Sequence, residues 1–320
     1  MIRPDSRAPT RSEVERWLTV SSGLDERAWS VDPPIGDVST RKYFRGRSPR
    51  DATVIVAWYP PDARSTHRRY QQASRLLETA GVRVPEILAS DEAGCYMVLE
   101  DVGTRRLFDL DPEEERTVRL FGSAMDLAAR IGGLPEAAVI QLNPPLDRVL
   151  FERELDQTWR LFLGERLPSP LAARARDALA GLCRDLDTGP RVACHRDFMA
   201  RNLMVHNDSL VVIDHQDLRA GPAGYDLASL FYDSCRLDPG ARRSLELGAG
   251  PACRGERYHR LVVQRMLKIV GTFHAFARRG APQYLPMVPE ALAHALDHLG
   301  ALPGLDELAQ ALRCARAAGR

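Results

Sequence analysis

The chain shows two different patterns of apolar and polar positions. In its first hundred residues, aromatic and basic residues alternate over 37–45, a β-rich run covers 53–59, and a short apolar run covers 95–99. These runs predict two or three antiparallel strands, because alternating and short apolar segments bounded by turn residues are typical of strands. Apolar residues at helical spacing over 65–80, followed by Gly81, predict a helix between the strands.

The polar segment 100–104 separates this part from a second one dominated by long helical patterns. Helix-like apolar spacing occurs at 113–131, 150–163, 170–186, 224–235, 258–277, 289–299 and 305–317. Short β-like runs interrupt them at 192–194, 203–205 and 210–213, and residues 206–209 form a hairpin turn between the last two. We therefore predict an α+β protein with two lobes: an antiparallel-sheet lobe, residues 1–101, and a larger, mainly helical lobe, residues 102–320.

Composition restricts the function further. The 320 residues carry 44 basic and 43 acidic side chains, so a net charge of +1 gives no global field for attracting nucleic acid or an anionic membrane. The first sixteen residues are polar, with no apolar signal core, and no apolar run is long enough for a membrane span.

Ser12 and Glu15 have capping-box spacing and predict a short helix there. Six cysteines without metal-site spacing favour reduced, buried thiols in a cytoplasmic protein.

One motif carries chemistry. His195-Arg196-Asp197-Phe198-Met199-Ala200-Arg201-Asn202 fits the pattern H-R-D-x-x-x-x-N, and Asp214 follows at the end of the next apolar run. A lone aspartate after a strand is usually a turn residue or a helix cap, but a turn does not require His, Asp and Asn at these offsets. Phosphoryl transfer from ATP needs a carboxylate beside the attacking hydroxyl, and an amide oxygen with a second carboxylate to hold Mg²⁺. Asp197 is the candidate base, and Asn202 and Asp214 are the candidate metal ligands.

These residues, together with Gly221 to Leu230 and the segment 37–45, resemble the aminoglycoside phosphotransferase and choline kinase superfamily. Within it, the sequence is most similar to bacterial N-acetylmuramate/N-acetylglucosamine anomeric kinases of cell-wall recycling. The resemblance implies a protein-kinase-like fold, with the adenine of ATP bound to the backbone near Glu100 and Val102. It also implies transfer of the γ-phosphate to the anomeric hydroxyl of a small sugar, with Asp197 as the base.

The first lobe departs from the general kinase pattern. It contains no G-x-G-x-x-G segment, and the strand 54–58 has Ala or Trp where a phosphate-binding lysine is expected. The chain has only two lysines, Lys42 and Lys268, and Lys268 is inside a predicted helix of the second lobe. We therefore expect the phosphate contact to come from Lys42, Arg41 or Arg45. Strand alternation places 41, 43 and 45 on one face and 42 and 44 on the other. The alternative is that these basic residues lie on a solvent-exposed edge strand and bind no ligand.

The acceptor is predicted to be a small molecule, because no A-P-E segment for holding a peptide substrate follows Asp214. The helix around 151–163 offers Arg153, Glu154, Asp156, Gln157, Trp159 and Arg160 as a sugar site, although a helical Trp beside leucines is more often core. Two alternatives stay open. One is an aminoglycoside or other small-alcohol kinase, and the other is a catalytically inactive nucleotide-binding regulator.

Overall fold

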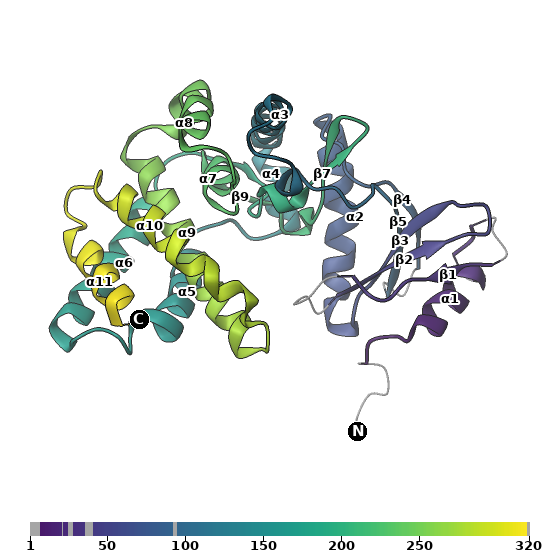
Figure 1. The fold of residues 1–320 in the computed structure, drawn as a ribbon, viewed down its shortest axis with the longest axis horizontal. Coiled ribbons are helices and arrows are strands. Elements are labelled where there is room, and N and C mark those ends of the chain that lie inside the picture. Colours follow the sequence, from purple (N-terminus) through teal and green to yellow (C-terminus); the bar gives the residue numbers. More distant parts are fainter. Residues whose placement is uncertain (1–6, 21, 25–27, 36–40, 92–94, 319–320) are drawn as a thin grey trace. The chain divides into compact units, whose positions relative to one another are not determined.

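A computed structural model of the protein describes residues 7–20, 22–24, 28–35, 41–91 and 95–318. The chain divides into two compact units. Unit 1 contains Met1–Arg105 and Met204–Asp217, and unit 2 contains Arg106–Leu203 and Leu218–Arg320. Figure 1 identifies the elements of each unit by label and colour.

Unit 1 is built on an antiparallel sheet. Within the described residues its strands are β1 (Ser30–Val31), β2 (Lys42–Arg47), β3 (Thr53–Trp58), β4 (Ile87–Ser90) and β5 (Tyr96–Glu100), in the order β1-β2-β3-β5-β4. The predicted antiparallel strands are confirmed, and β1 and β4 are additions that short, weakly patterned segments did not predict. Residues 37–40 of the predicted alternating segment lie outside the described residues.

A helix packs on each face of this sheet. Helix α1 (Arg11–Val20) packs Val14 and Leu18 with Phe44 of β2, whereas α2 (Arg64–Thr79) packs Tyr70 with Ala57 of β3. Strand alternation explains the division, because successive side chains point to opposite faces. The predicted helices are confirmed, but the capping contact of α1 is different: Thr10 N donates to Glu13 Oε2 at 2.7 Å, two residues before the expected Ser12 and Glu15 pair.

The hairpin of β7 (Leu203–His206) and β8 (Ser209–Val212) belongs to unit 1 from Met204 onward. Asn207 and Asp208 form its turn with φ of 47° and 59°, values that Asn and Asp tolerate better than most residues. Val205 N donates to Arg105 O at 2.7 Å, and Val212 N donates to Arg83 O at 2.9 Å. These backbone bonds explain why the observed division includes 204–217 with the sheet, whereas the predicted one cut the chain once, between 101 and 102.

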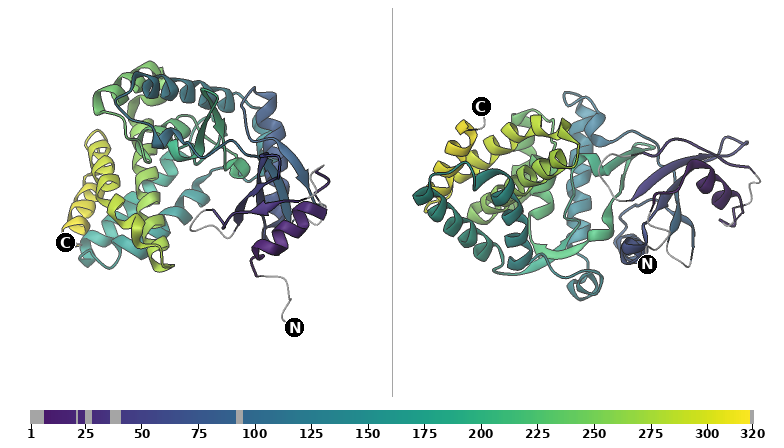
Figure 2. Two further views of the ribbon diagram at one scale, coloured as in Figure 1. Left: turned by 45° about the vertical axis from the view of Figure 1, so that its right-hand side comes forward. Right: turned by 90° about the horizontal axis from the view of Figure 1, so that it is seen from below.

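Unit 2 is mainly helical, as predicted. Its helices are α3 (Glu115–Gly132), α4 (Glu136–Leu142), α5 (Arg148–Thr158) with a π-helical turn at Trp159–Leu163, α6 (Ser169–Leu186), α7 (Tyr225–Tyr232), α8 (Pro239–Gly248), α9 (Gly255–Arg278), α10 (Val288–Leu299) and α11 (Asp306–Ala318). The long helix α9 contacts α5, α7 and α10, whereas α11 contacts α6 and α10. In Figures 1 and 2 these C-terminal helices are the green-to-yellow ribbons. The predicted helices are confirmed, while α4 and α8 were not predicted.

Helices α5 and α9 approach each other closely at Gly271. A Cβ atom added at this position would lie 2.8 Å from Thr158 N and 2.9 Å from Thr158 Cα, so a larger residue does not fit without a shift. Thr158 Oγ1 also donates to Leu267 O at 2.7 Å. This crossing therefore fixes how closely α9 packs against α5.

A short two-stranded sheet positions the loop that follows it. Strand β6 (Arg191–Cys194) pairs antiparallel with β9 (Arg219–Pro222), with Cys194 opposite Arg219. The sequence Arg-Ala-Gly-Pro of β9 has no β-branched residue, which explains why the apolar pattern did not predict it. Residues 195–202, which carry the motif, therefore leave from the end of a paired strand.

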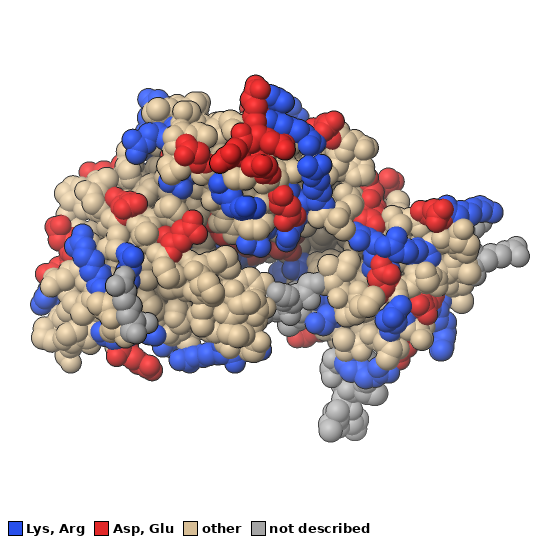
Figure 3. Space-filling view, in the orientation of Figure 1, with Lys and Arg blue, Asp and Glu red and all other residues tan. Residues whose placement is uncertain are grey.

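The surface and the cysteines agree with most of the compositional expectations. Figure 3 shows basic and acidic side chains interspersed on the face in view. No helix among the described residues is long and apolar enough to cross a membrane. All six cysteines are free thiols, but only Cys183 and Cys194 are fully buried, so the expectation of burial is wrong for Cys95, Cys235, Cys253 and Cys314.

Candidate active site

The catalytic-motif loop of unit 2 is held by a carboxylate beneath it. Arg196 has a φ of 78°, a backbone conformation that is uncommon for a residue with a side chain. Asp226, in the first turn of α7, accepts hydrogen bonds from His195 N at 2.7 Å and Arg196 N at 2.9 Å. Asp226 therefore fixes the backbone of the loop at His195 and Arg196.

Two cations from α9 contact the carboxylate of Asp197. Arg265 Nη1 lies 2.9 Å and Lys268 Nζ lies 2.8 Å from the same oxygen, Oδ1. Burial opposes ionisation of Asp197, but the charges of Lys268, Arg265 and Arg196 outweigh it and hold the pKa well below its usual range. Asp197 is therefore a carboxylate at neutral pH, as a base must be.

The second carboxylate oxygen of Asp197, Oδ2, is not in contact with the two cations. Within the described part of the chain, no hydrogen bond is made to Oδ2, and the side chain is 29% exposed. A base must reach the hydroxyl that it deprotonates within about 2.6–3.2 Å. Because both cations occupy Oδ1, the arrangement presents Oδ2 to an acceptor.

The cations of this cluster are matched to buried carboxylates. Arg265, 1% exposed, donates from Nη1 to Arg196 O at 2.6 Å and from Nη2 to Asp233 Oδ2 at 2.6 Å. Arg196 Nη2 donates to Glu154 Oε1 at 2.5 Å, and Gln264 Nε2 donates to Glu154 Oε2 at 2.9 Å. Buried charges are tolerated only when they are paired and hydrogen-bonded, and this network meets that condition.

Asn202 lies beside Asp197, as the motif requires. Its Nδ2 donates to the backbone oxygen of Asp197 at 2.9 Å, which turns the amide oxygen Oδ1 away from that bond. An amide oxygen is a suitable ligand for Mg²⁺. The other candidate metal ligand, Asp214, belongs to unit 1.

In unit 1, Asp214 is paired with one of the candidate phosphate-binding residues. Arg41 Nη2 donates to Asp214 Oδ1 at 2.9 Å, and Gln216 Nε2 donates to the same oxygen at 3.0 Å. Asp214 has a φ of 64°, so its backbone is held in a left-handed conformation. The Arg41 guanidinium also lies 5.8 Å from the centre of the Tyr43 ring, on the face of the sheet that packs against α2.

The other two small-lobe cations have different surroundings. Arg45 forms a two-pronged ion pair with Asp101, with distances of 2.7 and 3.1 Å, and its Nη2 also donates to Gly103 O. Lys42 pairs in register with Trp58, on the same face as Phe44 and opposite to Tyr43 and Arg45. The predicted alternation is confirmed, and it separates Lys42 from the two arginines. Which of the three contacts phosphate stays a prediction.

The two residues predicted to lie at the adenine have mostly structural contacts in unit 1. Glu100 accepts from Arg83 Nη2 at 2.6 Å and from Glu86 N at 3.2 Å, and its own N–H donates to Glu86 O. Val102 is buried in an apolar cluster with Met204, Val211 and Ile213. The backbone oxygen of Val102 also lies 3.2 Å from His206 Nδ1, and the adenine contact stays a prediction.

Comparison with known proteins assigns the chain to a family. Residues 30–261 match the model of the phosphotransferase enzyme family. The chain belongs to this family. It is 31% identical over 312 residues to an N-acetylmuramate/N-acetylglucosamine kinase of Pseudomonas putida, covering 92% of this chain and 90% of the relative. A protein of the same name from Pseudomonas aeruginosa is 32% identical over 300 residues, covering 88% and 87%.

Solved structures agree with the phosphotransferase fold. A thermostable mutant of aminoglycoside phosphotransferase APH(4)-Ia, in a ternary complex with AMP-PNP and hygromycin B, superposes with a TM-score of 0.64 at 15% identity. The match covers 92% of this chain and 99% of that one. The predicted two-lobed kinase-like α+β fold and the resemblance to small-molecule kinases are therefore confirmed.

The residues that we expected to line the acceptor site do not all lie together. Glu154 is buried in the network behind the catalytic loop of this phosphotransferase, with Arg196 and Gln264. Asp156 and Trp159 instead line a cavity of about 400 Å³ between α5 and α6, where Arg176 pairs with Asp156 and covers the Trp159 ring. The residues predicted to line the acceptor site therefore lie in two separate places, one behind the catalytic loop and one in the cavity between α5 and α6.

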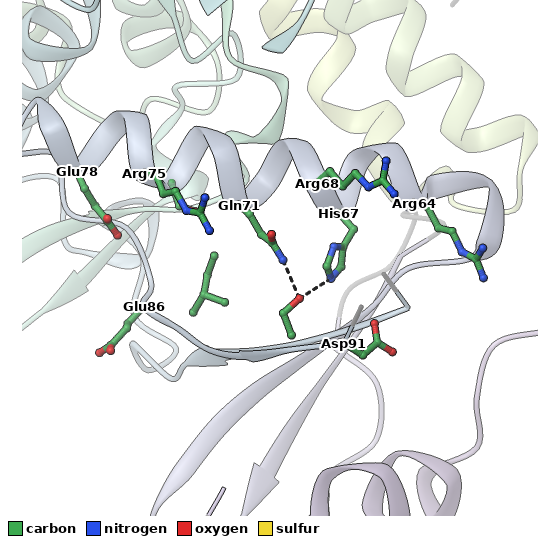
Figure 4. A pocket seen from close by; sticks show the side chains of 11 residues that line it. Arg64, His67, Arg68, Gln71, Arg75, Glu78, Glu86 and Asp91 are labelled. Carbon is green, nitrogen blue, oxygen red and sulfur yellow. Dashed lines mark hydrogen bonds between the residues drawn. The ribbon is translucent and has the colours of Figure 1, made fainter. Parts of the chain in front are cut away.

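A further cavity of the phosphotransferase lies within unit 1 and contains none of the candidate residues. It has a volume of about 680 Å³ and lies between α2 and β4. In Figure 4, His67, Gln71 and Arg75 extend from α2 toward the strand. Gln71 Nε2 donates to Ser90 Oγ at 2.7 Å, and the His67 ring lies 3.2 Å from the same hydroxyl. This cavity lies outside the predicted catalytic and nucleotide sites.

Sequence reasoning missed the α9 residues of the phosphotransferase site. Lys268 was set aside because it is inside a helix, and Arg265 was not considered. A signal was available: Gln264, Arg265 and Lys268 interrupt an otherwise apolar run from Leu261 to Val270. A helix that is apolar on all sides is buried, so charges within it require partners.

Proposed function

We propose that this phosphotransferase transfers the γ-phosphate of ATP to the anomeric hydroxyl of N-acetylmuramate or N-acetylglucosamine. The names of its relatives, at 31% and 32% identity over most of both chains, support the acceptor class. The observation that supports the reaction type is the Asp197 carboxylate, which the cations of α9 keep ionised and whose Oδ2 has no hydrogen bond among the described residues. In this proposal unit 1 binds the nucleotide and unit 2 supplies the base and the acceptor site.

The chemistry follows from the roles of the chain's residues. Asp197 Oδ2 accepts the hydrogen of the acceptor hydroxyl and orients its oxygen toward the γ-phosphorus. A bond forms between that oxygen and the phosphorus, the bond to the β,γ-bridging oxygen breaks, and ADP leaves with the electron pair. The hydroxyl proton moves to Asp197. The products are a sugar 1-phosphate and ADP.

The residues present also fit Mg²⁺, which prefers oxygen ligands and usually binds through one or two protein groups together with phosphate. Asn202 Oδ1 and the Asp214 carboxylate would hold it, and the ion would neutralise charge on the phosphates. Arg41 and Gln216 both contact Asp214 Oδ1, so Asp214 Oδ2 would be the oxygen that holds the ion while Arg41 stays on Oδ1. Six free thiols and the use of ATP are both suited to the cytoplasm.

A substrate panel tests the proposal. Purified protein with ATP and Mg²⁺ is assayed against N-acetylmuramate, N-acetylglucosamine, kanamycin and choline, with ADP release as the readout. The matched control is the methyl glycoside of N-acetylglucosamine, which lacks only the free anomeric hydroxyl. We expect turnover with the two free sugars and none with the glycoside. Turnover of the glycoside would exclude the anomeric position, and turnover of kanamycin or choline alone would contradict the acceptor class.

Asp214→Ala tests the metal role separately. We expect it to lose the Mg²⁺-dependent part of nucleotide binding, measured by calorimetry with ADP in the presence and absence of Mg²⁺. Equal nucleotide affinity of the wild type with and without Mg²⁺ would contradict the assignment.

A further inference from the structure

The two cations on Asp197 differ in how fully their hydrogen-bonding capacity is used. Arg265 is 1% exposed, and its guanidinium contacts Asp197, Asp233 and the backbone oxygen of Arg196. Lys268 is 14% exposed and, among the described residues, has one hydrogen bond, to Asp197 Oδ1. An ammonium has three N–H donors on a rotatable bond. Arg265 is therefore a fixed part of the loop's support, whereas Lys268 has donors left for a ligand.

The position of Lys268 relative to the reacting atoms follows from the base. An acceptor hydroxyl bound by Asp197 Oδ2 and the ammonium bound by Oδ1 are joined through one carboxylate group. The oxygen of that hydroxyl is the atom to which phosphorus becomes attached. The ammonium of Lys268 therefore lies next to the position where the transferred phosphoryl group arrives.

The residue type also fits this position. The chain has 42 arginines and two lysines, and one of the two lysines contacts the candidate base. An arginine binds a fixed partner with a planar fork, whereas a lysine is a compact point charge that can follow a moving group. Charges aimed at a transferring phosphoryl group are a general means of accelerating its transfer.

We propose that Lys268 is a catalytic residue whose ammonium contacts Asp197 and the phosphoryl group as it moves from ATP to the acceptor oxygen. This inference rests on the proposed function. It places a phosphate-contacting lysine on α9 of unit 2, in addition to the cations of the small lobe. The proton of the acceptor hydroxyl still goes to Asp197, and Lys268 keeps its own protons throughout the transfer.

A merely structural reading would give Lys268 the task of neutralising a buried carboxylate. Glu154 already has Arg196, and both Asp233 and Asp197 have Arg265. Arg265 is shared by Asp197 and Asp233, so the loss of Lys268 leaves a cation on Asp197 but only two cations, Arg196 and Arg265, for three carboxylates. We therefore expect some loss of stability as well, and kcat is compared only among variants that are folded.

The experiment compares Lys268→Met, Lys268→Ala and Lys268→Arg with wild type, using ATP and N-acetylmuramate. Arg278→Met is the matched control, because it removes an exposed cation from the last residue of the same helix. Thermal unfolding is recorded for each variant. Lys268→Ala is also assayed with n-propylamine, which replaces the missing part of the side chain, and with n-propanol, which has a similar shape but no charge.

We expect kcat to fall by about 10²- to 10³-fold in Lys268→Met and Lys268→Ala, as for the loss of one charge-stabilising donor. Lys268→Arg should retain more activity, and Arg278→Met should match wild type. We expect n-propylamine, but not n-propanol, to restore turnover of Lys268→Ala in a saturable way. A lysine needed only for the stability of the fold would leave the kcat of folded Lys268→Ala near that of wild type, so n-propylamine would have no activity to restore.

Two results overturn the inference: Lys268→Met with the kcat of wild type, or folded Lys268→Ala that n-propylamine does not rescue. These results are distinct from a failure of the proposed function. A wild type that phosphorylates no sugar would overturn the proposed function, whereas an active wild type with an equally active Lys268→Met overturns the role of Lys268 alone.

Discussion

Each unit pairs an arginine with a candidate catalytic carboxylate, but the two pairs are built differently. In unit 2, Arg265 is 1% exposed and Asp197 is 29% exposed, whereas in unit 1 Arg41 and Asp214 are 16% and 36% exposed. Arg265 also binds Asp233 and a loop carbonyl, and Asp197 has Lys268 as a second cation. At Asp214 the second donor to Oδ1 is the neutral side chain of Gln216 and not a second cation.

The difference suggests a division of roles. A base must be in place before the acceptor arrives, and a buried network of paired charges holds it there without reorganisation. A ligand of a metal that enters with the nucleotide has to be in place only when the nucleotide is bound. A more exposed ion pair contributes less to stability, and a smaller contribution is sufficient for that role.

The largest expected effect is that of Asp197→Asn. The substitution keeps the shape of the side chain but removes the base, and we expect kcat to fall by about 10²- to 10⁴-fold. Nucleotide binding should stay close to wild type, because the base acts on the acceptor. Steady-state kinetics together with ADP titration calorimetry measure both quantities. A variant with more than half of the wild-type kcat would contradict the assignment of the base.

Arg265→Met tests whether the buried pair is structural. It leaves Asp233 without its cation and removes a donor from the loop carbonyl of Arg196, and breaking a buried pair typically costs about 3–5 kcal/mol. We expect a loss of that size in the free energy of unfolding, measured by urea denaturation. Arg41→Met, the matched change in unit 1, should cost about 1 kcal/mol or less. Equal losses of unfolding free energy in the two variants would contradict the view that the Arg265 pair is structural and the Arg41 pair is not.

Acid should lower the folding stability of unit 2 through His298, which lies in a histidine cluster away from Asp197. Burial, with His259 and His294 nearby, lowers the pKa of His298 from 6.5 to about 3. Between these values the unfolded chain binds the proton and the folded chain does not, so stability falls as the pH falls. This group should cost about 2 kcal/mol between pH 7 and pH 5. Urea denaturation at both pH values should show a smaller decrease in His298→Gln, and an unchanged decrease would exclude this origin.

The smallest effects concern the three cations that precede or occupy β2. We expect Arg41→Ala to raise the KM for ATP about tenfold, as for loss of one charged hydrogen bond. Arg45→Ala should act mainly on the melting temperature, because its guanidinium is bound to Asp101 and Gly103. Lys42→Ala should have the smallest effect on KM, since Lys42 faces away from the arginines. The opposite order, with Lys42→Ala raising KM most, would identify the lysine as the phosphate contact, and Lys42→Arg should then be tolerated better than Lys42→Ala.

Local features of the site could be predicted because they are encoded in adjacent residues. The motif 195–202 places Asp197 beside Asn202, and strand alternation separates Lys42 from Arg45. The Asn207-Asp208 turn was readable for the same reason, since both residues tolerate positive φ. Each of these inferences depends on a periodicity or an offset of a few residues.

The support of the base could not be predicted in this way. Lys268 lies 71 residues from Asp197 in the sequence, and Glu154 lies 42 residues from Arg196. Helical periodicity shows that α9 is buried but not which element it meets. The helix α9 and the motif loop come together only because α5, α7 and α9 pack as one core.

The close approach at Gly271 limits how the reaction centre can be altered. Gly271 has no functional group, yet it is less than one helical turn from Lys268 and fits directly against Thr158. Any side chain there would push α9 away from α5 and carry both cations with it, since a helix moves as a rigid rod. A directed-evolution library that varies only polar residues around Asp197 would overlook this position. A redesign of acceptor preference therefore has to leave the crossing of Gly271 and Thr158 unchanged while it varies the residues that face the ligand.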